Sequence, residues 1–123
     1  KNIYEDTLHS QKEILTITNP KDLSNFLGEY MQSYVKERTK KKISLRGLAP
    51  NDEYGRKAMQ ENPNSFRQGK LFPKEYTVNN EIMIYDTKVA IYSGKDGVGI
   101  VIDNESIAST FRNLWQMIWD KTE

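Results

Sequence analysis

Two arginines stand out as candidate anion-binding groups, because each lies inside a segment that otherwise has the pattern of a β-strand. Arg46 lies in the apolar run Ile43–Ala49, and Arg67 lies in Phe66–Phe72. A guanidinium removed from water needs anionic or carbonyl partners. Arg46 can form a structural ion pair with an acidic neighbour. It can equally hold an anionic ligand at the carboxyl end of a parallel strand, where open α/β sheets bind ligands, and Arg67 could converge on the same place.

Nucleophilic and metal-assisted catalysis have few residues to draw on. The chain has no cysteine and one histidine, His9, which excludes thiol nucleophiles, thiolate clusters and histidine-rich zinc sites. We interpret His9 as a solvated residue near the start of the chain rather than as part of a Ser-His-Asp site. Gly94, Gly97 and Gly99 stand between two predicted strands, which is typical of a hairpin and not of a phosphate-binding loop. A carboxylate-only Mg²⁺ site or a glycosidase pair stays open, yet no spacing favours either, so we expect no metal and no cofactor.

A basic run follows the most amphipathic segment of the chain. Cations there suit the negative end of a helix dipole, which is one interpretation. The other is contact with nucleic-acid phosphates. The formal net charge of +1 argues against a chain whose whole surface binds nucleic acid, but it allows a local patch. The run consists of Lys36, Arg38, Lys40, Lys41 and Lys42.

The elements that position these residues begin with a βαβ unit. Apolar residues recur at helical spacing from Leu23 to Val35 and predict one continuous helix. Asn19 and Pro20 precede it as the expected cap and first helical residue. Predicted strands at Lys12–Thr18 and Ile43–Ala49 flank this helix, which favours parallel pairing with a right-handed crossover.

The rest of the chain predicts one short helix, a series of strands and a closing helix. Asn51 caps a helix that runs to about residue 60, although Gly55 weakens that prediction. Asn62-Pro63-Asn64 is a turn signal. The predicted strands, which we expect to form an antiparallel meander, are Phe66–Phe72, Glu81–Tyr85, Lys88–Ser93 and Val98–Ile102. Asn104 caps the last helix, whose apolar stripe we place against the sheet: Ile107, Phe111, Leu114, Trp115, Ile118 and Trp119.

The predicted fold class is α/β, a single domain over residues 1–123 with a mixed sheet flanked by helices. The element order is β-α-β-α-β-β-β-β-α with a leading helix at residues 2–10. A 123-residue chain buries roughly two thirds of its unfolded surface, which is enough for one core without disulfides. No apolar run approaches a membrane span and no signal-peptide pattern is present, so we expect a cytoplasmic protein. Because the first residue is Lys, we expect a fragment of a larger protein.

From Glu81 onward the chain resembles half of a phospholipase D superfamily domain. That family carries H-x-K-x-x-x-x-D, followed by a hydrophobic strand, Gly or Ser, and a terminal helix ending near Trp. Here Asp86 holds the Asp position, and Lys88–Gly94 follows it. Asn79 stands at the His position and Glu81 at the Lys position. In the family the histidine attacks the phosphate and the lysine binds it, so the resemblance implies that hydrolase activity is lost.

A resemblance to the regulatory domain of TrmB-type transcriptional regulators, which have a degenerate phospholipase D-like fold, spans most of the chain. It rests on Tyr30–Tyr34 with the basic run, Ile43–Pro50, Glu81–Asp86, Lys88–Ile91 and the closing helix. It implies a homodimer, DNA contact through an amino-terminal helix-turn-helix that these residues do not include, and no catalysis. It also implies a possible small-molecule effector in the relic cleft. The candidate ligand-binding residues are therefore Arg46, Arg67, Asn79, Glu81 and Asp86.

Two other functions stay open at this point. One is a divergent nuclease or phosphodiesterase of the phospholipase D superfamily that uses an unrecognised acid and base. The other is a nucleic-acid-binding module that works through the basic run. The sequence does not identify an effector.

Overall fold

A computed structural model describes residues 2–60 and 65–123, so the predicted turn at Asn62-Pro63-Asn64 lies outside the described residues. The described strands form one six-stranded mixed sheet in the order β3-β2-β1-β4-β5-β6. The expected α/β fold class is therefore confirmed. None of the helices in the described part of the chain is long and apolar enough to cross a membrane.

The first half of the chain forms the parallel part of the sheet. β1 pairs in parallel with β2, and β2 pairs in parallel with β3. A helix connects β1 to β2, as the βαβ pattern predicted. A second helix connects β2 to β3, so β3 is parallel to β2 and does not join the antiparallel meander in which the sequence placed it. The elements are β1 (Ile14–Ile17), α2 (Pro20–Lys40), β2 (Leu45–Pro50), α3 (Glu53–Met59) and β3 (Arg67–Phe72).

The second half forms the predicted antiparallel meander and the closing helix. β4 (Glu81–Tyr85) and β5 (Lys88–Ser93) begin and end where the sequence placed them, and β6 (Val98–Asp103) is one residue longer than expected. β4 pairs antiparallel with β1, which joins the two halves of the sheet. α4 (Glu105–Lys121) begins after Asn104, whose side-chain oxygen accepts from the Ile107 amide as expected of a cap.

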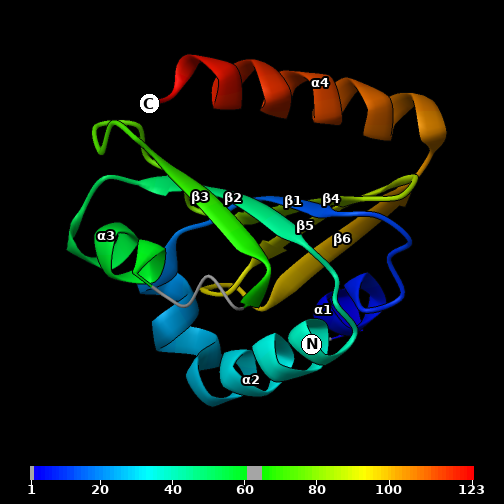
Figure 1. The fold of residues 1–123 in the computed structure, drawn as a ribbon, viewed down its shortest axis with the longest axis horizontal. Helices are drawn as coiled ribbons and strands as arrows, with labels where there is room; N and C mark the ends of the chain where they lie inside the picture. The colour runs from blue at the N-terminus through cyan, green and yellow to red at the C-terminus, as the bar shows by residue number, and fades with distance from the viewer. Residues whose placement is uncertain (1, 61–64) are drawn as a thin grey trace.

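The helices divide between the two faces of the sheet. In Figure 1, α2 and α3 lie on one side of the sheet together with α1 (Asn2–Thr7), and α4 crosses the other side. Alternation along each strand sends successive side chains to opposite faces. We call these the α2 face and the α4 face.

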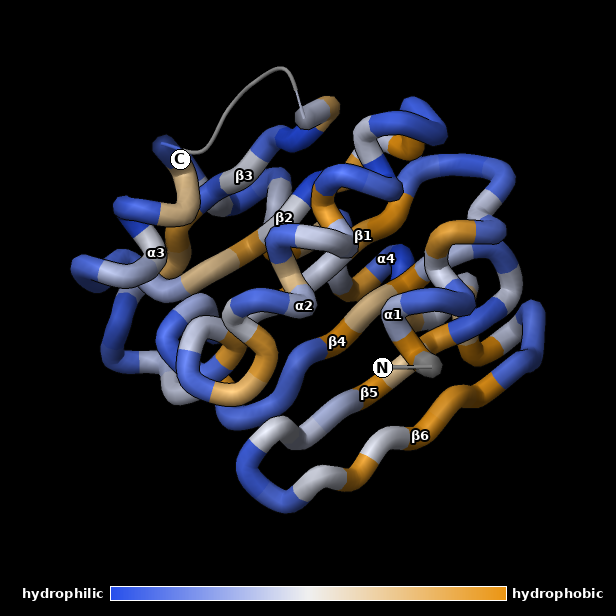
Figure 2. Tube along the Cα trace, turned by 90° about the horizontal axis from the view of Figure 1, so that it is seen from below, coloured by the Kyte–Doolittle hydropathy of each residue, from blue (hydrophilic) through white to orange (hydrophobic). Residues whose placement is uncertain are grey.

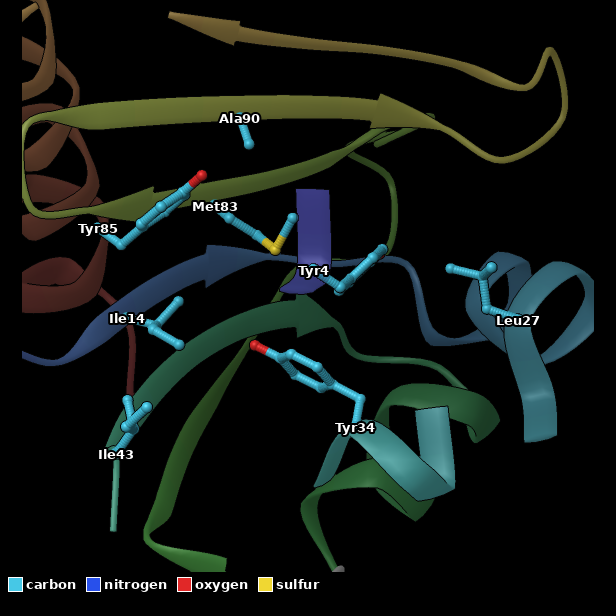
Figure 3. Close-up of a cluster of buried hydrophobic side chains, with 8 residues drawn as sticks. All are labelled: Tyr4, Ile14, Leu27, Tyr34, Ile43, Met83, Tyr85 and Ala90. Carbon is cyan, nitrogen blue, oxygen red and sulfur yellow. The ribbon is translucent and has the colours of Figure 1, made fainter. Parts of the chain in front are cut away.

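Each face carries its own core. Under α4, a cluster centred on Trp115 includes Leu15, Leu48 and Val89. On the α2 face, Tyr4 and Tyr34 pack with Ile14 and Met83, and Figure 3 shows these side chains between the sheet and the helices. Tyr4 makes edge-to-face contacts with Tyr34, Tyr30 and Tyr92 at centroid distances of 5.5, 6.1 and 6.0 Å.

α2 differs from the single continuous helix that the sequence predicted. Leu27 has φ −136° and ψ 16°, so the helix is kinked there, immediately before Gly28. Asn19 occupies the cap position, but its side chain makes no capping hydrogen bond. Its Nδ2 instead donates to the Val78 carbonyl at 3.0 Å, which attaches the start of α2 to the segment before β4.

α3 is capped by Asp52 and not by Asn51 as predicted. The Asp52 carboxylate accepts from the Gly55 amide at 2.8 Å. Gly55 weakened the helix prediction, but the structure requires a glycine there. A Cβ at this position would lie 1.9 Å from the Pro50 carbonyl oxygen, so only glycine lets α3 turn back so closely on the end of β2.

The apolar stripe of α4 faces the sheet only in part, which corrects the prediction for its full length. Trp115 and Ala108 are buried, whereas Ile107, Leu114 and Ile118 are exposed. The helix crosses a six-stranded sheet alone, so one side of its stripe stays in solvent. Exposed apolar residues also lie on β6, which is orange over much of its length at the edge of the sheet in Figure 2.

Candidate functional site

Glu81 and Thr18 form the centre of a buried polar layer on the α2 face. The antiparallel register pairs Ile17 with Ile82, so Thr18, just after β1, lies beside Glu81, the first residue of β4. Both are nearly inaccessible, at 3% exposed for Thr18 and 7% for Glu81. A carboxyl group and a hydroxyl are thus held at the end of two central strands, beneath α2.

This environment favours the neutral form of the Glu81 carboxyl group. Burial raises the pKa of Glu81 to about 8, although the nearby Thr18 hydroxyl and the Arg67 guanidinium oppose the rise. Oε2 of Glu81 and Oγ1 of Thr18 nevertheless make no hydrogen bond of good geometry to any described residue. At neutral pH the carboxyl group is therefore largely protonated, and the layer has unsatisfied polar atoms.

Arg67 enters the same layer from β3. The register of β2 and β3 places Arg67 beside Leu45, and its side chain reaches over Gly47. A Cβ on Gly47 would lie 2.9 Å from Thr16 Oγ1 and 3.7 Å from Arg67 Nη2. The glycine in mid-strand therefore avoids a close contact with the Thr16 hydroxyl, and the guanidinium lies within ordinary van der Waals distance of this position. Of the candidate residues, the structure brings Arg67 and Glu81 to one face.

Arg38 is a buried structural residue and not a nucleic-acid contact, which corrects its place in the basic run. It is 1% exposed, and its Nη1 donates to the Ile43 and Ser65 carbonyls at 2.8 Å each. Burial lowers the pKa of Arg38, and the nearby Arg67 lowers it further. The other members of the run are exposed at the end of α2 or just beyond it, so nucleic-acid contact by them stays a prediction: Lys36, Lys40, Lys41 and Lys42.

Arg46 lies on the other face of the sheet and takes the structural role that the sequence left open. Its Nε and Nη2 donate to both carboxylate oxygens of Glu13, the shortest distance being 2.7 Å. Its guanidinium carbon lies 4.8 Å from the Trp115 ring centroid and 5.2 Å from that of Trp119. Arg67 pairs with Leu45, the residue before Arg46. Successive residues of a strand point to opposite faces, so Arg46 does not converge with Arg67.

Asp86 lies at the far end of β4 from Glu81, in the turn to β5. Its backbone has φ 51°, and its carboxylate accepts from the Gln11 amide at 3.1 Å while its carbonyl accepts from Arg112 at 2.7 Å. These contacts hold the turn against the start of the chain and against α4. Asp86 thus does not share a site with Arg67 and Glu81.

Asn79 stays beside Glu81, but the recess that they line is small. It has a volume of about 10 Å³, and Asn19, Phe26 and Gly94 close it. That volume suits about one water molecule and not a phosphodiester. The positions that resemble the catalytic pair of phospholipase D therefore carry no ligand-sized cleft here.

A larger groove runs between α2 and α3, with a volume of about 820 Å³. Thr18 and Arg67 reach it from the sheet, Lys36 lines it from α2, and Lys57 lines it from α3. In Figure 2, which is seen from the α2 face, α2 and α3 lie side by side. Arg67 and Lys36 were predicted as candidate residues from the sequence, whereas Thr18 and Lys57 were not. A polar residue directly after an apolar strand was the available signal for Thr18.

The described residues offer no metal centre: within 2–60 and 65–123, no three His, Cys, Asp or Glu side chains lie close enough together to hold an ion.

Comparison with known proteins supports the fold and not a family assignment. No protein-family model matches the sequence, and a comparison with curated proteins found no match. Among solved structures, the chain is similar to TrmBL2, described as an archaeal chromatin protein with a novel mode of DNA binding. The TM-score is 0.68 at 13% sequence identity, over 99% of this chain and 49% of that one. The predicted resemblance is thus confirmed in three dimensions: these 123 residues have the fold of about half of the TrmBL2 chain.

Proposed function

We propose that the chain is a non-catalytic regulatory domain of a DNA-binding protein, and that it pairs with a second copy and senses a small molecule. The observation that carries this proposal is the fold shared with half of a chromatin protein that binds DNA. An amide and a buried, largely neutral carboxyl group occupy the positions of the phospholipase D nucleophile and phosphate-binding lysine, which supports the absence of catalysis. DNA contact would belong to a helix-turn-helix outside these residues.

Pairing has a suitable surface on α4 and β6. Leu114 is 51% exposed, and Val98 and Ile100 on the edge strand are each 54% exposed. Two copies of α4 packed antiparallel about residues 112 and 113 would place Ile107 of one opposite Ile118 of the other. The same arrangement brings the acidic first turn at Glu105 near the basic last turn of the partner helix, so the surface is self-complementary in charge.

Sedimentation of the wild type and of Leu114→Glu tests the pairing. We expect the wild type to sediment as a dimer and Leu114→Glu as a monomer, because a charge inside an apolar interface is strongly unfavourable. Tyr76→Glu is the matched control, since Tyr76 is 68% exposed and lies in the loop between β3 and β4. A wild type that stays monomeric at high concentration contradicts the pairing. Turnover of bis(p-nitrophenyl) phosphate above the level of a mock purification contradicts the absence of catalysis.

A further inference from the structure

The groove between α2 and α3 is unlike the apolar surface of α4, because it combines apolar walls with cations. Leu23, Met31 and Val35 line it from one face of α2, and Ala58 lines it from α3. Its volume of about 820 Å³ lies within the ordinary range of small-molecule sites.

Positive charge gathers in this groove from three elements. Lys36 and Lys57 reach it from facing helices and Arg67 from the sheet, whereas Glu53 is the acidic residue among those lining it. Lys21 adds to the charge near one end, with its Nζ 5.9 Å from the ring centroid of Tyr54, another lining residue. The local excess of cations contrasts with the formal charge of +1 for the whole chain.

A buried polar atom points to a ligand independently of that charge. Thr18 lines the groove and is 3% exposed. Its Oγ1 interacts with the Glu81 carboxyl but makes no hydrogen bond of good geometry to any described residue. Buried hydroxyls of native proteins are normally satisfied by protein, water or ligand. The neighbouring Glu81 carboxyl is largely neutral at pH 7, so it does not offset the cations fully.

We propose that this groove binds a small organic anion, with an apolar body between α2 and α3 and an anionic group, a carboxylate or a phosphate, held by Lys36, Lys57 and Arg67 above Thr18. This inference deepens the sensing part of the proposed function and rests on it. It moves the effector site away from the recess at Asn79 and gives the effector a chemical class. An occupant that bridges α2 and α3 also contacts both sides of the kink at Leu27.

Three naphthalene derivatives with the same apolar body test the proposal by titration calorimetry: 1-naphthyl phosphate, 1-naphthoate and the neutral 1-naphthol. We expect an anion to bind at least about tenfold more tightly than 1-naphthol, because the neutral probe cannot form charge-assisted hydrogen bonds with the three cations. The preferred anion distinguishes a phosphate ligand from a carboxylate ligand. Equal binding of all three probes, or no binding, overturns the proposal.

Variants locate the site. Lys36→Gln combined with Lys57→Gln should weaken the anion about tenfold and leave 1-naphthol unchanged. Lys40→Gln combined with Lys95→Gln removes the same charge from exposed positions outside the groove and should change neither. Thr18→Val should weaken the anion severalfold with little change in the thermal midpoint, and an unchanged affinity in both groove variants overturns the assignment. Sedimentation of the same samples separates the outcomes, because a dimer without anion binding leaves the pairing proposal standing.

Discussion

The two faces of the sheet have opposite characters. On the α4 face, one straight helix buries Trp115, whose Nε1 donates to the Thr16 carbonyl at 2.9 Å. The partly buried cations there have partners, because Arg46 pairs with Glu13 and Lys70 donates to the Trp119 carbonyl. On the α2 face, the helix is kinked at Leu27, and Tyr4, Thr18 and Glu81 each carry a buried oxygen without a partner of good geometry among the described residues. The comparison indicates that the α4 face stabilises the fold, while the α2 face carries the unsatisfied polar groups on which the proposed anion site depends.

The largest expected effect is the loss of stability when the core beneath α4 is disrupted. Trp115→Ala should lower the free energy of unfolding by about 3–5 kcal/mol, because it leaves a cavity under α4 and removes the stacked contact with Trp119. Urea unfolding followed by circular dichroism measures the change. Met117→Ala on the same helix is the control and should cost little, since Met117 is 62% exposed. Equal losses in the two variants would contradict the assignment of stability to this face.

An effect of intermediate size concerns the α2 face, where the buried Glu81 makes stability depend on pH. The pKa of Glu81 is about 8 in the folded protein and has an ordinary value of 4.5, so the folded state holds a proton that the unfolded chain releases between these pH values. Stability should therefore fall as pH rises from about 4.5 to about 8. Glu81→Gln removes this titration. Relative to the wild type, its free energy of unfolding should therefore rise by an amount on the order of a few kcal/mol between pH 4.5 and pH 8, with little difference near pH 4.5.

Thermal and urea unfolding at both pH values measure the Glu81 effect. Glu13→Gln is the control, because Glu13 is a paired carboxylate on the other face of the sheet. An equal advantage of Glu81→Gln at pH 4.5 and pH 8 would show that the carboxyl group is not held neutral.

The smallest effect compares the two helix starts. Asn104→Ala should cost about 1 kcal/mol of stability, because its Oδ1 caps α4 at 2.9 Å from the Ile107 amide. Asn19→Ala should cost less, about 0.5 kcal/mol, since its side chain makes one hydrogen bond to Val78 and does not cap α2. Urea unfolding of both variants measures the difference, and a larger loss for Asn19→Ala would reverse our reading of the two ends.

The sequence predicted the regular parts of this fold well, and the reasons are local. β4 and β5 were placed correctly because Ile82, Ile84, Val89 and Ile91 alternate and a tight turn separates them. The kink at Leu27 was missed because apolar periodicity continues through it, and the cap of α3 was assigned one residue early because both Asn51 and Asp52 can cap.

The candidate site was predictable only in part. Arg67 and Glu81 were named from an odd residue in a strand and from a family position, and the structure places them on one face. Arg46 and Asp86 were named on similar grounds, yet they lie on the opposite face and at the opposite end of β4. Which face a strand residue takes depends on register, and register depends on partners distant in the sequence. The groove between α2 and α3 is a property of helix packing that no short motif encodes.

The buried Arg38 has a consequence for how the molecule assembles. A single guanidinium group joins the last turns of α2 to the carbonyl before β2 and to the carbonyl at Ser65, which precedes β3. Both carbonyls must be in place before the guanidinium group is removed from water, because both accept a hydrogen bond from its Nη1. We therefore expect the segment before β3 to dock onto the end of α2 in the same step that buries Arg38.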